Sequence, residues 1–212
     1  DIFEFALASA QGFKKQYEMI FNKLQYLNDK NTKIIFIEGN HEFDLKALQQ
    51  IILHYVDSYI YKMKVNEHNT FLFTHGDEIF SDIKYKLFKT IVKSKLIITF
   101  AKYLFYPALE WFALKQASIS RTIQKNKIKN HQKIILNSFK FLQKHNSDVL
   151  FFGHFHEKYS LKNSDDKIII GVESWEKIPN CVIWTENNLF RAYYNDSTKE
   201  WVVYQDNPLM IR

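Results

Sequence analysis

Histidines that directly follow short apolar segments are the residues of this chain best suited to chemistry. His154 and His156 come after Val149–Phe152, and His75 comes after residues 70–73. Apolar segments this short, with β-branched and aromatic residues, predict buried strands rather than helices. Each histidine is therefore expected where a strand passes into a loop, and neutral imidazole is a good ligand for divalent metal ions at such a place.

The two histidines of the Gly153-His154-Phe155-His156 loop are two residues apart. In an extended segment such residues project from the same face, about 7 Å apart along the backbone, so they could serve neighbouring metal ions rather than chelate one. A histidine pair in a loop is more often ordinary solvated surface, so the metal interpretation needs support from other loops.

A third loop has the same context. The apolar segment 34–37 leads into Glu38-Gly39-Asn40-His41-Glu42, just as residues 70–73 lead into His75-Gly76-Asp77. Each loop alone reads as a polar turn. In α/β sheets, however, sites are built in the loops beyond the carboxyl ends of the strands, and unrelated surface histidines are not expected to share that context.

The side chains of these loops and of the chain start form a mixed oxygen and nitrogen ligand set. Such a set suits Mn²⁺, Fe²⁺ or Zn²⁺, and the lack of thiolates argues against a closed structural zinc site. Two ions about 3.5–4 Å apart could share one carboxylate, generate hydroxide and clamp a phosphoryl group, which is hydrolysis of a phosphate ester or anhydride. His41 could stabilise the phosphoryl oxygens or protonate the leaving oxygen. The candidate metal ligands are Asp1, Asn40, His75, His154 and His156.

The elements that must position these loops follow from apolar periodicity. Helical spacing predicts helices over 13–27, with Phe13, Tyr17, Ile20, Leu24 and Leu27 on one face, and over 45–55, with Leu45, Leu48, Ile52 and Tyr55 on one face. Further strands are expected in the latter part of 59–65 and at 168–172, 182–184, 189–194 and 201–204, and the polar turns between the later ones suggest a meander.

Residues 82–145 differ from the rest and look like a helical insertion, rich in lysine and aromatic residues. Its helices could pack on the core with their lysines solvated, or form a basic, aromatic cap that faces lipid, because such helices lie in the membrane interface and attract anionic head groups. Arg121, Lys125 and Lys129 are the candidate contacts to phosphate or head groups.

Composition bounds these interpretations. The 212 residues fit one domain, and 46% apolar residues can build a full core. The single cysteine, Cys181, indicates a reducing compartment, and the sequence shows no signal peptide or membrane span, so a cytoplasmic location is expected. A net charge of +6 fits an anionic partner.

The order D, GNHE, HGD and GHxH, from Asp1 to His156, resembles the calcineurin-like metallophosphoesterase superfamily. The resemblance implies an α/β fold, a β-sandwich flanked by helices, here with a helical cap. It implies Asp1 as the bridging ligand, Asn40, His75 and His154 at one ion, and His156 at the other. The family's D-x-H motif is absent and is expected upstream of Asp1, which suggests an N-terminally truncated sequence.

Within the superfamily, residues 1–4, the basic insertion, and Ser174 with Trp175 resemble the UDP-2,3-diacylglucosamine hydrolases of lipid A synthesis. This implies an enzyme with two divalent ions, Mn²⁺ being the expected metal, that lies peripherally on the cytoplasmic face of the inner membrane. It would cleave a nucleotide-linked lipid to UMP and 2,3-diacylglucosamine 1-phosphate. The sequence departs from that family at Asn40-His41, where Asn-Arg is usual.

Two other functions stay open. The chain could be a soluble phosphoesterase or nucleotide pyrophosphatase whose insertion is simply a cap, or a non-catalytic scaffold on a membrane or protein partner. Nucleic acid is not an expected partner, because many of the lysines fall in the insertion and no groove-reading motif is present.

Overall fold

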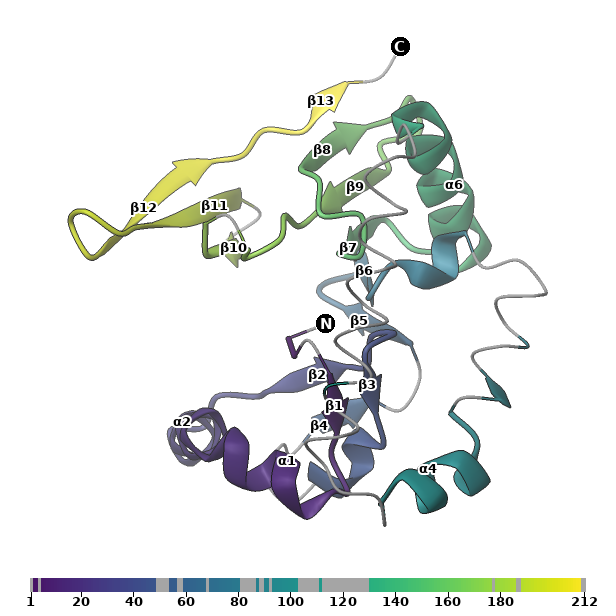
Figure 1. The fold of residues 1–212 in the computed structure, drawn as a ribbon. Coiled ribbons are helices and arrows are strands. Elements are labelled where there is room, and N and C mark those ends of the chain that lie inside the picture. The colour runs from purple at the N-terminus through teal and green to yellow at the C-terminus, as the bar shows by residue number, and fades with distance from the viewer. Residues whose placement is uncertain are drawn as a thin grey trace. The chain divides into compact units, whose positions relative to one another are not determined.

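The computed structural model of the chain forms two compact units. It describes residues 2–3, 5–48, 54–56, 59–67, 69–80, 87, 90–91, 93–102, 111, 130–176, 178–185 and 188–210. The first unit comprises Asp1–Tyr59 and Phe80–Asn130, and the second comprises Ile60–Ile79 and His131–Arg212. Figure 1 labels their elements.

The first unit holds short helices and two pairs of parallel strands around an aromatic core. Its elements are β1 (Ala6–Leu7), α1 (Gln11–Gln16), α2 (Glu18–Asp29), β2 (Ile35–Ile37), β3 (Glu42–Phe43), the 3₁₀ helix η1 (Leu45–Leu48), β4 (His54–Val56) and α4 (Lys95–Lys102). β1 pairs with β3 and β2 with β4. Phe3 is the centre of the core: its ring stacks on Phe36 at 6.2 Å and meets Phe13 edge-on at 5.1 Å. Burial of several such rings stabilises the loops that the strands carry.

The second unit is built on a six-stranded mixed sheet in the order β13-β8-β9-β7-β6-β5. Its elements are β5 (Ile60–Lys64), β6 (Thr70–Thr74), η2 (Asp77–Ile79), α6 (His131–Lys144), β7 (Val149–Phe152), β8 (Tyr159–Lys162), β9 (Ile168–Gly171), β10 (Asn180–Thr185), β11 (Asn188–Asn195), β12 (Glu200–Gln205) and β13 (Leu209–Met210). β6, β7 and β9 run parallel to one another, and all four residues of β7 are buried. A continuous apolar strand is typical of the centre of a parallel sheet.

A helix and a second sheet cover this mixed sheet. α6 lies beside this sheet and contacts β7, β9 and η2 (Figure 1). Ile134 and Leu142 of α6 are buried. β10, β11 and β12 form an antiparallel meander, and Trp184 of β10 meets Phe71 of β6 edge-on at 4.7 Å. A buried ion pair fastens this sheet, because Arg191 bonds both Asp206 and the Tyr159 carbonyl of β8.

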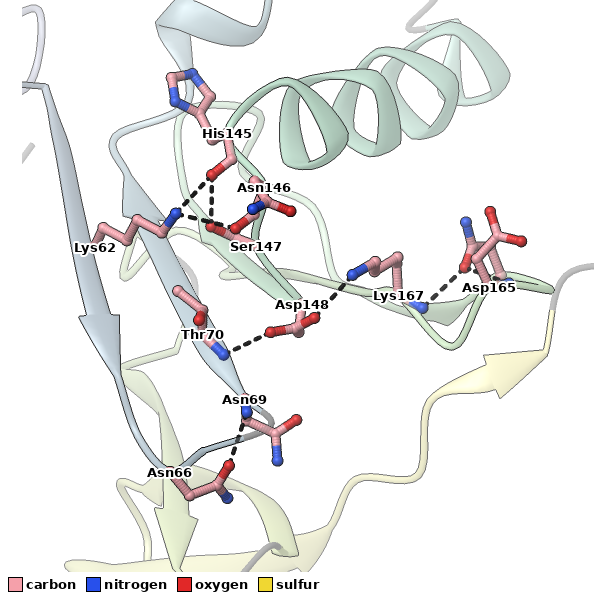
Figure 2. Close-up of polar contacts among 11 residues, drawn as sticks. Lys62, Asn66, Asn69, Thr70, His145, Asn146, Ser147, Asp148, Asp165 and Lys167 are labelled. Atoms are coloured by element: carbon pink, nitrogen blue, oxygen red, sulfur yellow. Dashed lines mark hydrogen bonds and ion pairs between the residues drawn. The ribbon is translucent and has the colours of Figure 1, made fainter.

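Polar contacts hold the other end of β6 and β7, away from their carboxyl ends (Figure 2). The Lys62 ammonium donates to the His145 and Asn146 carbonyls at 2.8 and 3.0 Å. The Asp148 carboxylate accepts the Thr70 N–H at 2.6 Å and the Lys167 ammonium at 2.8 Å. These bonds fix where β6 and β7 start, and therefore the register in which they end.

The predicted α/β class is confirmed, and the meander and the strands before the three loops form as expected. The helix expected over 45–55 is wrong: η1 ends at Leu48 and β4 follows, because pairing with β2, Tyr55 opposite Phe36, outweighs the local helical spacing. The helix expected over 13–27 is two helices that meet at Tyr17. Strand β8 was not predicted.

Much of the expected insertion, residues 82–145, lies outside the described residues. Its described parts include α4, whose Ile98 packs against the core of the first unit, and α6, which belongs to the second unit. No helix among the described residues is long and apolar enough to cross a membrane. The single-domain organisation with an insertion stays a prediction.

Candidate metal centre

The ends of β6 and β7 bring two of the expected ligands together. The strands are parallel, with Thr74 opposite Phe152, so that the loops after them start side by side. The Gly153 N–H donates to the His75 carbonyl at 2.9 Å. As a result the imidazoles of His75 and His154 lie 4.9 Å apart between ring centroids, with their planes inclined at 72°.

Gly76 is required for this close approach. Its φ of +117° suits only glycine, and a Cβ there would lie 3.0 Å from both the Gly153 carbonyl oxygen and the His154 Cβ. Gly76 thus allows the His154 side chain to pack against the Gly76 backbone. The two motifs are spatial neighbours because of backbone shape as well as sheet register.

The GHxH loop holds both of its histidines in a left-handed backbone conformation. His154 has φ 60° and His156 has φ 57°, and the Phe155 N–H closes a tight turn on the Gly153 carbonyl at 2.6 Å. For residues other than glycine such a conformation costs about 1 kcal/mol or more, and it concentrates at functional sites. The extended segment expected here is wrong, because the chain turns at each histidine.

A buried carboxylate orients His75. Asp77 Oδ1 lies 3.0 Å from His75 Nδ1, and the two residues are 4% and 7% exposed. A carboxylate at Nδ1 favours the tautomer with its proton on that nitrogen, which leaves Nε2 unprotonated as a metal ligand requires. Asp77 was in the HGD motif but was given no role from sequence; its spacing of two residues from His75 was the available signal.

The environment of His154 keeps its imidazole neutral. Burial is the main cause and the neighbouring His75 adds to it, and together they lower the pKa of His154 to about 3. A neutral imidazole has a lone pair for a cation at physiological pH. His156, two residues on, is exposed.

In the first unit, the Glu42 carboxylate holds the GNHE loop in shape by hydrogen bonds. Its carboxylate is fully buried and accepts the N–H groups of Gly39 at 2.8 Å, Ile2 at 2.6 Å and Phe3 at 3.3 Å. The segment that follows Asp1 is therefore bonded directly to the loop that carries Asn40. Asp1 itself lies outside the described residues.

Asn40 has an unused ligand atom. Its Oδ1 is buried and has no hydrogen-bond partner among the described residues. A buried amide oxygen left unpaired is costly unless something binds it, and an amide oxygen is a suitable ligand for Mn²⁺ or Zn²⁺. His41 follows it in the same loop and is partly buried.

The described residues thus place the expected ligands in both units. Asn40 and His41 belong to the first, whereas His75, His154 and His156 belong to the second. Within the described part of the chain, no three His, Cys, Asp or Glu side chains lie together as a metal-holding group. Arg121, Lys125 and Lys129, the expected substrate contacts, lie outside it.

The chemistry of the individual donors nevertheless fits a divalent metal. Asn40 offers an unpaired buried oxygen, His75 is oriented by a carboxylate, and His154 is neutral. These are three different observations, and each is what a metal ligand needs before the ion binds.

Comparison with known proteins places these loops in a family. The model of the calcineurin-like phosphoesterase family matches residues 10–158, a range that contains the GNHE, HGD and GHxH loops. No curated protein matches the sequence.

Solved structures with a similar backbone fold include two of Vps29 from Entamoeba histolytica. One is the wild-type protein in complex with zinc, with 9% identity, a TM-score of 0.42 and coverage of 85% of this chain and 73% of that chain. The other is a single mutant, with 9% identity, a TM-score of 0.40 and coverage of 90% of this chain and 89% of that chain. At such TM-scores these likenesses say nothing about the activity of this chain.

Proposed function

The chain belongs to the calcineurin-like phosphoesterase family, and from this membership and its ligand loops we propose a metal-dependent hydrolase that cleaves the pyrophosphate bond of UDP-2,3-diacylglucosamine. The products would be UMP and 2,3-diacylglucosamine 1-phosphate. The observation that carries the hydrolase part of the proposal is the pair His75 and His154, held with their rings 4.9 Å apart at the ends of parallel strands.

Members of this family typically bind divalent metal ions, and we propose two, of which Mn²⁺ is the expected metal. Bound metal would supply the hydroxide nucleophile and neutralise charge on the phosphoryl oxygens. Asp1, Asn40, His75, His154 and His156 would hold the ions. Asp77 would fix the His75 ring, and the left-handed backbone would fix His154 and His156.

His41 would act on the substrate. It adjoins the proposed metal ligand Asn40 in a loop that Glu42 holds in shape, so we propose that its imidazole contacts a phosphoryl group bound to that metal. A protonated imidazole there would donate a hydrogen bond to a phosphoryl oxygen or a proton to the leaving oxygen. Arginine, usual at this position in the lipid A enzymes, would do only the former, because it does not release its proton.

The lipid part of the proposal is supported by exposed apolar residues in the segment that follows β9. β7 and β9 are parallel, with Phe152 opposite Gly171, so the segment after β9 starts at the same sheet edge as His154. In that segment Trp175 and Ile178 are 62% and 50% exposed. Exposed apolar side chains in a segment that starts at the edge of a polar site suit a substrate with both a phosphate and an acyl or ring group.

This apolar segment is shaped by Asn180. The Asn180 carbonyl accepts the Trp175 indole N–H at 2.5 Å, and its side-chain amide donates to the Ile178 carbonyl at 3.0 Å. Trp175 is therefore held with its indole nitrogen satisfied and much of its ring exposed. An aromatic ring fixed in this way loses little entropy on binding.

A substrate with acyl chains would be met at a membrane, so we propose a peripheral enzyme on the cytoplasmic face of the inner membrane. The net charge of +6 is compatible with an anionic membrane surface. Arg121, Lys125 and Lys129 stay the proposed head-group or phosphate contacts.

The test is release of UMP from UDP-2,3-diacylglucosamine by the full-length protein, with and without Mn²⁺. Turnover of soluble phosphodiesters alone would replace the lipid assignment by that of a soluble phosphoesterase. No bound metal and no turnover would favour a scaffold.

A further inference from the structure

Lys93 reaches into the GNHE loop of the first unit from the segment expected as the insertion. Its ammonium donates to Glu38 Oε1 at 2.6 Å, to the Gly39 carbonyl at 2.7 Å and to the Glu42 carbonyl at 2.7 Å. An ammonium has three N–H donors, and here all three have acceptors on one loop. The acceptors lie on both sides of Asn40 and His41.

This lysine is largely removed from water. Its side chain is 10% exposed and that of Glu38 is 9% exposed. The ammonium also lies over the rings of Phe43 at 5.2 Å and Tyr59 at 5.0 Å, which favour a cation. A charge buried this far is tolerated because every proton is bonded and a carboxylate balances it.

Stability alone is a weak reason for such a group. Burying an ion pair costs about as much as it returns, and well-packed apolar residues often serve equally well. What apolar residues cannot do is fix two backbone carbonyls, of Gly39 and Glu42, at one point. The Lys93 ammonium does this, while the Glu42 carboxylate holds the Gly39 N–H.

The hydrogen bonds of Lys93 and Glu42 leave one buried oxygen of the loop, Asn40 Oδ1, without a partner among the described residues. The loop is thus held in a shape in which the amide oxygen is available to a cation. We propose that Lys93 is a positioning residue that holds the Asn40–His41 loop ready for metal, an inference that rests on the function proposed above.

The proposal also gives residues after Ile79 a role in the site. Lys93 lies just before α4, whose Ile98 packs on the same aromatic core that includes Phe3 and Phe36. The segment is therefore anchored at both the core and the metal-ligand loop, and a change in it would be felt at Asn40.

The test compares Lys93→Met with Lys95→Met, a matched loss of an exposed lysine two residues away. Amide hydrogen exchange measures the loop directly. We expect the amides of Gly39 to Glu42 to lose at least ten-fold protection in Lys93→Met and to keep it in Lys95→Met, with β7 unchanged in both. Unchanged loop protection in Lys93→Met, or equal loss in β7, would overturn the proposal.

Mn²⁺ affinity, measured by titration calorimetry on the metal-free proteins, is the second readout. Lys93→Met should bind about 10- to 100-fold more weakly, the usual effect of removing a group that orients a ligand, and Lys95→Met should bind normally. Normal affinity in Lys93→Met contradicts the proposal. If the unmutated protein binds no Mn²⁺, the proposed function fails, and the exchange result still decides the role of Lys93.

A second variant covers the case in which Lys93→Met does not fold because Glu38 is left as an unpaired buried charge. Lys93→Met combined with Glu38→Gln removes both charges and should restore folding. The Gly39 and Glu42 carbonyls remain unheld, so weak Mn²⁺ binding and an unprotected loop are expected again. Full recovery of both in this double variant would show that charge balance, and not loop position, was the role of Lys93.

Discussion

The Asp77 carboxylate lies 3.0 Å from Nδ1 of His75, and both residues are buried. This relationship makes His75 more than a histidine in a loop, since it sets which ring nitrogen carries the proton. The His154 ring lies 4.9 Å away at the same edge of the six-stranded sheet, and this pair carries our proposal of a metal site there.

Asp77→Asn should weaken metal binding while the fold survives. The amide carries no charge and holds the His75 tautomer less firmly, so Mn²⁺ affinity should fall by about 10- to 100-fold. Calorimetric titration measures it, and Asp196→Asn, on an exposed turn, is the control. Equal affinity of the Asp77 variant and the unmutated protein would show that the carboxylate does not orient the ligand.

Gly76→Ala should destabilise the protein and disturb the histidine pair. The new Cβ would meet the Gly153 oxygen and the His154 Cβ at 3.0 Å in a conformation unsuited to alanine, so we expect a loss of about 1–3 kcal/mol in the free energy of unfolding.

Gly153→Ala is the comparison for that loss. Its Cβ would meet the His75 carbonyl at 3.3 Å, without a positive φ, so its cost should be smaller. Urea denaturation gives both values. If Gly76→Ala lost as little free energy of unfolding as Gly153→Ala, or less, the loops of His75 and His154 could move apart without loss of stability.

Trp175→Ala should separate lipid from soluble substrates. Loss of the exposed ring should raise the KM for UDP-2,3-diacylglucosamine by about ten-fold or more, since large fixed aromatic rings dominate such contacts, and should change the kcat/KM for bis-p-nitrophenyl phosphate much less. Steady-state kinetics on both substrates checks this. Parallel losses on the two would show that the ring supports the site rather than the lipid.

Acid should remove the stabilising effect of Asp148. Burial raises the pKa of this carboxyl, but the bonds from Lys167 and the Thr70 N–H together outweigh burial, and the pKa lies below its usual 3.8. A carboxyl with a lowered pKa stabilises the fold above the unfolded value and loses that contribution as pH falls through the folded value.

Asp148→Asn should therefore be less stable than the unmutated protein at pH 7, by a margin that shrinks as pH falls below about 4. Thermal melts from pH 7 to pH 2.5 measure the margin. Asp165→Asn, at an exposed turn, should show no comparable margin. A difference for Asp148→Asn that stays constant with pH would rule out ionic pairing as its source.

The sequence predicted the parts of the site that depend on strand ends. An apolar segment followed by a histidine was enough to place His75 and His154 at one edge, because parallel register then brings their loops together. The left-handed turns at His154 and His156 could not be foreseen, since histidine has no strong preference for that conformation. For Asp77 the spacing of two residues from His75 was a signal, but its contribution also depends on burial, which the sequence does not show.

Long-range partners were beyond the sequence. Lys93 lies more than fifty residues from the loop that it holds, and nothing in its neighbourhood distinguishes it from the other lysines of the segment. The helix expected over 45–55 failed for a related reason, because pairing of Tyr55 with Phe36 decided its structure. Local periodicity predicts elements well only where no distant partner competes.

The most direct test of the account is to measure bound metal and UMP release on one preparation of the full-length protein. The account predicts about two divalent ions per chain and UMP release from UDP-2,3-diacylglucosamine with Mn²⁺. Replacement of His154 by alanine should abolish both metal binding and UMP release. A protein that folds, binds no divalent metal and releases no UMP would contradict it.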